Sequence, residues 1–64
     1  MEKLTKRECD IIELLMEGLS NRQIAKRLFV STHTIKAILE KIYQKTGIHN
    51  RILLVLYYYR HISK

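Results

Sequence analysis

Four stretches of this chain carry apolar residues at helical spacing, and each stretch is preceded by an apolar or partly apolar residue and then a capping residue. The four pairs are Leu4-Thr5, Leu19-Ser20, Val30-Ser31 and His49-Asn50. Thr, Ser and Asn side chains accept hydrogen bonds from the first free amides of a helix. The pattern therefore predicts an all-α domain of four helices, near residues 5–17, 20–28, 31–46 and 50–61.

Two of these helix starts carry a second signal. Glu8 stands three residues after Thr5, and Gln23 stands three residues after Ser20. This is the spacing of a capping box, in which two side chains satisfy each other's backbone amides. Both glycines of the chain stand just after a predicted helix, where a left-handed residue often ends it. Because the connections are short, consecutive helices are expected to pack on one another.

Apolar positions three and four residues apart select the side of each helix that is expected to be buried. For the first three helices the expected core is Leu4, Ile11, Leu14, Leu15, Ile24, Ala25, Leu28, Ile35, Leu39 and Ile42, flanked by Ile12, Met16, Ile38 and Thr46. On the third helix the polar side remains outward. Its expected outward residues are Thr32, His33, Lys36, Ala37, Glu40, Lys41 and Gln44.

The second and third predicted helices form a pair of short helices joined by a tight apolar turn. This is the layout of a helix-turn-helix, which places its second helix in the major groove of DNA. The start of the third helix would reach base edges, and its later outward residues would lie along backbone phosphates.

The fourth predicted helix is apolar on more than one side. One side holds Ile52, Val55, Leu56 and Tyr59, and the others hold Leu53, Leu54, Tyr57 and Tyr58. In so small a domain an edge helix buries one side, so the rest is a candidate partner surface, where tyrosine is common. We expect a symmetric dimer through Leu53, Leu54, Tyr57 and Tyr58. The alternative, a core helix with some exposed tyrosine, remains open.

Composition and charge narrow the function. The chain has 64 residues, enough for a single domain spanning 1–64, and a net charge of +6. Residues 1–18 sum to −2, whereas residues 19–64 carry nine lysines and arginines against Glu40 alone. Such a one-sided basic surface fits a polyanion partner, although a solubilising surface is the alternative.

Other classes of function find little support. The single cysteine, Cys9, and the absence of a signal peptide or a long apolar run favour a soluble, cytoplasmic protein that does not contact a membrane. The histidines and Cys9 lack metal-ligand spacing. The sequence shows no catalytic nucleophile paired with a general base. Glu8 and Glu13 are interpreted as a helix cap and part of a solvated helix face. The sequence predicts no enzyme, metal or cofactor.

The residues that carry these patterns resemble a known family. LTKRE at the start, ELLMEGLSNRQIAKRLFVSTHTIK in the middle and KTGIHNR near the end are similar to the DNA-binding domain of LuxR/GerE-type bacterial transcription regulators. The resemblance covers Leu4 to about Leu56. It implies a four-helix domain whose third helix reads the major groove and whose fourth often supplies a dimer contact. Relatives usually carry an N-terminal sensing domain as well.

The resemblance also implies roles for individual residues. Ser31, Thr34 and Lys36 match the family's third-helix cap and its phosphate- or base-contacting TVK. Asn21 and Arg22 match the backbone-contacting start of the second helix, and Asn50 and Arg51 match the NR that opens the fourth. Four residues depart from the family pattern: Gln23, Ile38, Glu40 and Thr46. Ile38 stands in place of a histidine, and Glu40 stands where relatives often carry an uncharged or basic residue.

The leading hypothesis is a transcription regulator, or the effector domain of one, that binds duplex DNA as a homodimer. The expected DNA-contacting residues are Asn21, Arg22, Ser31, Thr32, His33, Thr34, Lys36, Ala37, Glu40, Lys41, Lys45, Asn50 and Arg51. For His33, simple exposure is the alternative. RNA polymerase or a related regulator is a further candidate partner. A second hypothesis is a small anti-activator that pairs with a related regulator through the fourth helix.

Overall fold

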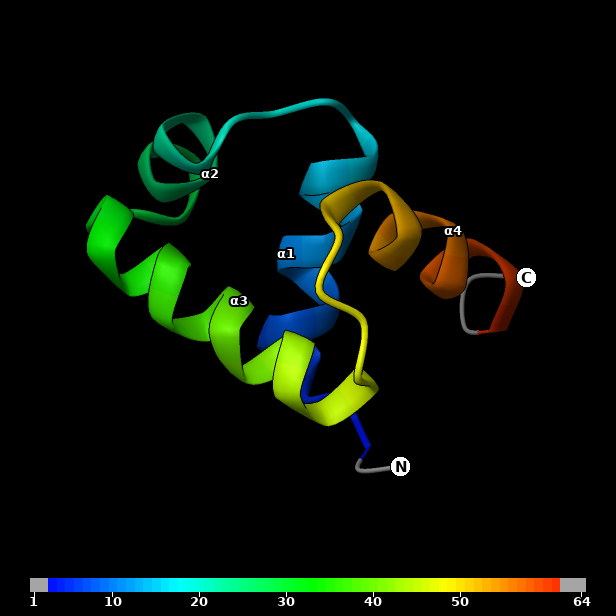
Figure 1. The fold of residues 1–64 in the computed structure, drawn as a ribbon. Helices are drawn as coiled ribbons and strands as arrows, with labels where there is room; N and C mark the ends of the chain where they lie inside the picture. Colours follow the sequence, from blue (N-terminus) through cyan, green and yellow to red (C-terminus); the bar gives the residue numbers. More distant parts are fainter. Residues whose placement is uncertain (1–2, 62–64) are drawn as a thin grey trace.

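The computed structural model describes residues 3–61, which form four helices and no strand (Figure 1). Their bounds are α1 Lys6–Met16, α2 Asn21–Leu28, α3 Thr32–Thr46 and α4 Arg51–His61. The all-α, four-helix prediction is confirmed. Each helix begins one residue after its predicted cap, because the capping residue itself stays outside the helical conformation.

The predicted caps set the start of every helix. Thr5 and Ser20 each form a complete capping box, with Glu8 and Gln23 respectively. The Ser31 hydroxyl accepts from the Thr34 amide at 3.1 Å. The Asn50 side-chain oxygen accepts from the Ile52 and Leu53 amides at 2.9 and 3.1 Å. These bonds satisfy amides that the helices leave unpaired.

The turn between α2 and α3 has an unexpected backbone conformation. Phe29 ends α2 with φ 60° and ψ 41°, in the left-handed region. Glycine usually takes this conformation, because a Cβ clashes with the following carbonyl oxygen. The amides of Phe29 and Val30 donate to the carbonyls of Lys26 and Ala25, so the turn closes α2 in spite of this strain.

The core lies where the first three helices meet, with α4 added on one side. Its members are Ile11, Ile12, Leu14, Leu15, Ile24, Ala25, Ile35, Leu39, Ile42, Leu54 and Tyr58. The spacing predicted eight of these, or nine when the flanking residue Ile12 is included. Two further predicted core residues, Leu4 and Leu28, are only partly buried. Met16 is exposed instead, since it lies at the last turn of α1.

The prediction of a partner surface on α4 was wrong for two of its four residues. Leu54 and Tyr58, expected at a dimer surface, are 0% and 3% exposed in the chain's own core. They lie one helical turn apart and face α1, where the Tyr58 hydroxyl donates to Glu13 Oε2 at 2.6 Å. Apolar residues surround α4, so periodicity alone could not select the buried side. The exposed apolar residues are Ile52, Leu53, Leu56 and Tyr59.

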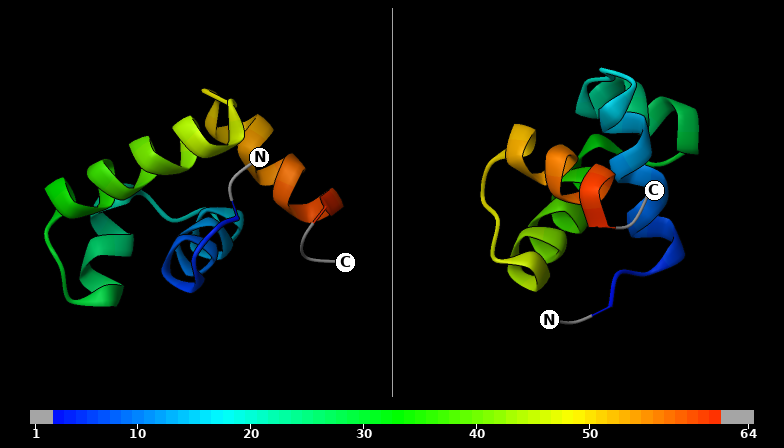
Figure 2. Two further views of the ribbon diagram at one scale, coloured as in Figure 1. Left: turned by 90° about the horizontal axis from the view of Figure 1, so that it is seen from below. Right: turned by 90° about the vertical axis from the view of Figure 1, so that its right-hand side faces the viewer.

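The arrangement leaves one long side of α3 uncovered. Seen from below, α2 and α4 lie at opposite ends of the molecule, with α1 between them and α3 running across (Figure 2). α3 packs against α2 and α1 through Ile35, Leu39 and Ile42. Within residues 3–61, no helix is long and apolar enough to cross a membrane.

Candidate nucleic-acid interface

The outward side of α3 forms a continuous exposed stripe. His33, Lys36, Ala37, Glu40, Lys41 and Gln44 are all exposed. Their spacing of three and four residues places them on one helix face, opposite the three buried residues of α3. The outward face that the sequence predicted is therefore present, with Thr32 half-buried at its beginning.

Two hydroxyls fix the beginning of this stripe. Besides capping the Thr34 amide, Ser31 Oγ lies 3.0 Å from Thr34 Oγ1. Thr34 is half-buried by its position in the first turn of α3. Both side chains therefore hold the entry of α3 in place, so that His33 and Lys36 project outward from a defined first turn.

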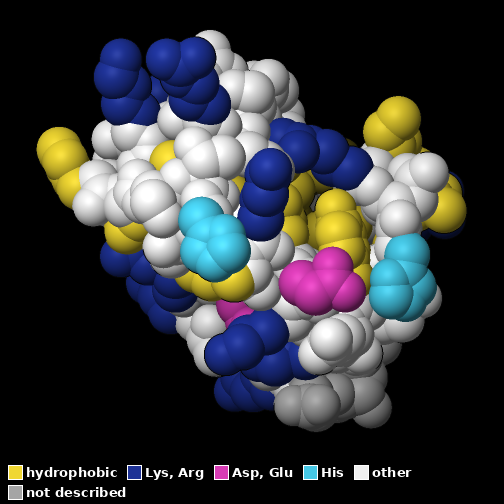
Figure 3. All heavy atoms as spheres, turned by 60° about the vertical axis from the view of Figure 1, so that its left-hand side comes forward, with side chains coloured by type: hydrophobic (Ala, Val, Ile, Leu, Met, Phe, Trp, Pro, Cys, Tyr) yellow, Lys and Arg dark blue, Asp and Glu magenta, His cyan; other side chains and the backbone are white. Residues whose placement is uncertain are grey.

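The surface around the stripe is basic. On α2, Arg22, Lys26 and Arg27 are exposed. With Lys36 and Lys41 on α3 they make five exposed cations, against Glu40 as the one carboxylate of residues 19–61. Figure 3 shows lysine and arginine side chains spread over this face, with few acidic ones among them. Lys26 and Arg27 were not among the predicted contacts, although the charge segregation covered them.

Lys45 has a different position from the one the sequence predicted. Its ammonium group donates to Glu8 Oε1 at 2.8 Å, and the two side chains are only 17% and 6% exposed. The bond joins the last turn of α3 to the first turn of α1. Lys45 is held in this internal ion pair and is not part of the exposed basic surface.

Glu8 is held in its charged form by this pairing. Burial alone would raise the pKa of Glu8, but the Lys45 hydrogen bond, the Thr5 amide and the Lys45 charge together outweigh it. The pKa of Glu8 therefore lies below the ordinary value of a glutamate. The expectation of a cap was correct for Glu8, but the side chain is buried and not part of a solvated face.

Arg51 and Asn21 contact each other. Arg51 Nη1 donates to Asn21 Oδ1 at 2.8 Å, and Arg51 Nη2 donates to the Leu19 carbonyl at 2.7 Å. Both side chains are half-buried. The sequence predicted both as DNA contacts, and in the structure they join the start of α4 to the start of α2. Asn50 caps α4 beside them, as described above.

No metal site accompanies this surface. Within the described part of the chain, no three His, Cys, Asp or Glu side chains lie close enough together to hold a metal ion. What the surface offers is a protruding helix face with hydroxyl, imidazole, ammonium and carboxylate groups, set in a basic surround. These are groups that contact base edges and phosphates in nucleic-acid complexes.

Comparison with known families gives one match over most of the chain. Residues 2–58 match the family described as bacterial regulatory proteins, luxR family. A family of transcriptional regulators is not a family of enzymes, in agreement with the sequence prediction.

Named relatives point the same way. A Mycobacterium bovis protein named as a candidate HTH-type transcriptional regulator is 50% identical over 52 residues, which is 81% of this chain and 6% of that protein. The transcriptional regulatory protein DegU of Brevibacillus brevis is 38% identical over 53 residues, 83% of this chain and 22% of DegU. The chain thus spans about a quarter or less of the length of these relatives.

A solved structure supports the fold. The response regulator ChrA, from a heme-sensing two-component system, superposes with a TM-score of 0.87 at 40% sequence identity. The superposition covers 94% of this chain and 30% of ChrA. The four-helix arrangement is therefore shared with a part of a known regulator.

Proposed function

Since the chain belongs to the luxR family of bacterial regulatory proteins, we propose that it binds duplex DNA through the outward face of α3 and regulates transcription. The observation that carries this proposal is the exposed stripe from His33 to Gln44, which no other described helix covers. An α-helix of this kind fits the width of the major groove. The relatives are named as transcriptional regulators, which agrees with the proposal.

The residues divide into two roles in this proposal. His33, Lys36, Ala37 and Glu40 lie along the first two exposed turns of α3 and face base edges. Arg22 at the start of α2 and Lys41 further along α3 lie beside the phosphates. Glu40 accepts from cytosine N4 or is repelled by a nearby phosphate, so its substitution is expected to alter which sequences are preferred.

We further propose that two copies pair through α4. Ile52, Leu53, Leu56 and Tyr59 are between 45% and 72% exposed and lie on the side away from the core. A symmetric pair would set two α3 helices on half-sites about 10 bp apart. The proposed partner places the site of action in the bacterial cytoplasm, where DNA lies. RNA polymerase would be a further partner of such a regulator.

A second candidate function uses the same surface of α4. A small protein that pairs with a related regulator through these apolar residues would block that regulator instead of binding DNA. The exposed apolar side of α4 favours pairing in either case, so the two functions differ in whether α3 contacts DNA.

Titration of a labelled duplex at several salt concentrations tests the leading function. Each phosphate neutralised by the protein should contribute about −0.9 to the slope of log K against log salt. Lys36→Gln should lower that slope and weaken binding, while Lys3→Gln, outside the proposed face, should leave both unchanged. A parent chain that shows no salt-dependent binding would exclude the DNA-binding proposal and favour the second candidate.

A further inference from the structure

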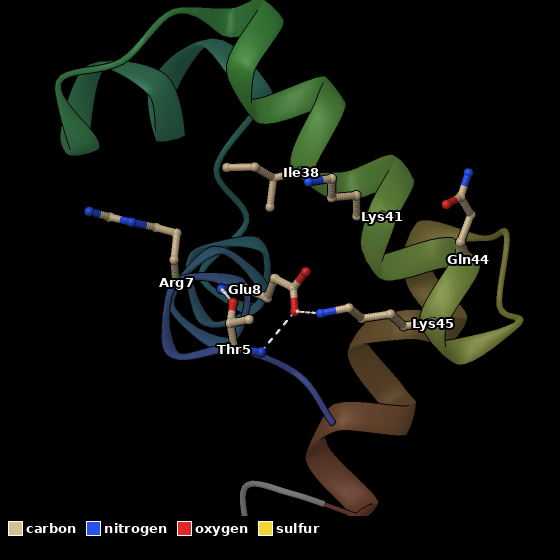
Figure 4. Close-up of a pocket in the computed structure, with 7 residues that line it drawn as sticks. All are labelled: Thr5, Arg7, Glu8, Ile38, Lys41, Gln44 and Lys45. Atoms are coloured by element: carbon tan, nitrogen blue, oxygen red, sulfur yellow. Dashed lines mark hydrogen bonds and ion pairs between the residues drawn. The ribbon is translucent and has the colours of Figure 1, made fainter. Parts of the chain in front are cut away.

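A groove of about 500 Å³ lies between the first turn of α1 and the second half of α3. Its walls include Thr5, Arg7 and Glu8 from the start of α1 and Ile38, Lys41 and Lys45 from α3. Figure 4 shows Arg7 projecting from α1, while Ile38 and Lys41 project from α3 on the other side of the open space. The groove thus brings together residues more than thirty positions apart in the sequence.

Two cationic side chains of the groove are available to bind a ligand. Arg7 and Lys41 are exposed, and neither makes a hydrogen bond or ion pair with another residue of the described range 3–61. The third cation, Lys45, is neutralised by Glu8 at 2.8 Å. The groove therefore has an excess of two positive charges, one on each wall.

The amides at the start of α1 do not supply this charge. The Thr5 amide donates to Glu8 Oε1 at 2.8 Å, and the Glu8 amide donates to Thr5 Oγ1 at 3.1 Å. The capping box thus occupies two of the donors that an anion would otherwise find at this helix start. An anion in the groove would be held by the Arg7 and Lys41 side chains.

The groove adjoins the outward stripe of α3. Lys41 follows Ala37 by four residues on the stripe, and follows Ile38 by three residues on the groove wall. Residues three and four apart are neighbours on a helix surface. Lys41 consequently stands at the border between the two surfaces, and the groove runs along the edge of the proposed DNA-reading face.

We propose that this groove receives the sugar-phosphate backbone of the DNA strand that borders the major groove, with Arg7 and Lys41 contacting phosphate oxygens from opposite walls. Ile38, half-buried on the α3 wall beside Lys41 (Figure 4), would face the apolar side of a deoxyribose. The site adds α1 to the DNA interface and assigns Arg7 a role in binding. It rests on the proposed function, because the same duplex occupies α3 and the groove.

The ion pair of Glu8 and Lys45 has a part in this site. An unpaired carboxylate at the base of the groove would repel a phosphate. Because Lys45 neutralises Glu8 there, Arg7 and Lys41 act on the backbone without an opposing charge. The pair is thus a positioning element of the site and not itself a phosphate contact.

The test compares two single-charge changes on α1. Arg7→Gln removes a groove cation, and Lys6→Gln removes the neighbouring cation, which pairs with Asp10 at 3.1 Å outside the groove. Both are titrated against a labelled mixed-sequence duplex of about 20 bp, two helical turns, over a range of salt concentrations. Arg7→Gln should reduce the log–log salt slope by about 0.9, and Lys6→Gln should leave it near the parent value.

Three results would overturn the proposal in distinguishable ways. If Arg7→Gln keeps the parental slope while Lys36→Gln lowers it, the groove does not contact DNA but the proposed function stands. If Lys6→Gln lowers the slope as much as Arg7→Gln, the effect is general charge and not the groove. If the parent shows no salt-dependent binding, the proposed function and the groove site both fail. Thermal unfolding of each variant checks that it is folded. Both variants are expected to fold like the parent, because Arg7 and Lys6 are exposed and do not pack in the core.

Discussion

The Arg51 guanidinium donates to the Asn21 side-chain oxygen across 2.8 Å, although thirty positions separate the two residues. A second bond from Arg51 reaches the Leu19 carbonyl at 2.7 Å. One side chain therefore joins the start of α4 to the connection that leads into α2. Removal of the guanidinium leaves the Leu19 carbonyl and the Asn21 amide group without their partner in a half-buried position.

We accordingly expect Arg51→Ala to destabilise the fold by roughly 1.5–3 kcal/mol, the range for hydrogen bonds to charged groups. The measurement is the free energy of unfolding from urea denaturation. Arg22→Ala, an exposed arginine in the first turn of α2, serves as the control and should change stability little. An Arg51→Ala variant of parental stability would mean that these bonds contribute nothing measurable.

The ion pair between Glu8 and Lys45 predicts a dependence of stability on pH. The pKa of Glu8 is lowered in the folded chain, so the carboxylate stabilises the fold above its unfolded pKa. That contribution is lost as the pH falls through about 4.5 and below. Urea denaturation of the parent from neutral to acidic pH should show this loss.

Lys45→Met should weaken that dependence. Without Lys45, only the Thr5 hydrogen bonds oppose the burial of Glu8, so the folded-state pKa of Glu8 rises relative to the parent. The variant should lose roughly 1–3 kcal/mol at neutral pH and approach the parent as Glu8 becomes protonated. Equal differences between parent and variant at neutral and acidic pH would contradict this account.

The exposed apolar side of α4 makes a prediction about pairing. Leu53→Glu places a charge on the exposed apolar side and should convert a dimer to a monomer in sedimentation equilibrium, without loss of helical signal. Leu54→Ala, at the adjacent buried position, should instead lower stability by about 2–5 kcal/mol through a cavity in the core. A Leu53→Glu chain that still forms the parental dimer would place the interface elsewhere.

Local signals in the sequence were sufficient for most of the fold. Caps, boxes and spacing located all four helices and the buried sides of α1, α2 and α3, because these depend on residues three or four apart. They could not orient α4, where Leu54 and Tyr58 are chosen by what α1 presents, including the Glu13 carboxylate. Because apolar residues lie on every side of α4, local spacing does not select the side that is buried.

The same distinction applies to the positions of the predicted site residues. Lys36 and Lys41 lie outward as the helical spacing required. Lys45 and Arg51 were chosen for charge, yet each has a partner 37 or 32 positions away that satisfies it. The groove cation Arg7 was passed over because it lies in the acidic part of the chain. Tertiary pairing, which local spacing does not encode, decided the positions of Lys45 and Arg51.

The left-handed turn residue Phe29 gives a final prediction about stability. Its side chain is 94% exposed, so it contributes almost no burial, while its φ of 60° carries the strain of a Cβ in the left-handed region. Phe29→Asn, a residue that tolerates this conformation, should raise the free energy of unfolding by up to about 1 kcal/mol. Phe29→Ala is the matched control, because it removes the ring but keeps the strained Cβ, and it should leave stability near the parent value. If Phe29→Ala stabilises the chain as much as Phe29→Asn does, then exposure of the phenyl ring, and not backbone strain, destabilises the fold at this turn.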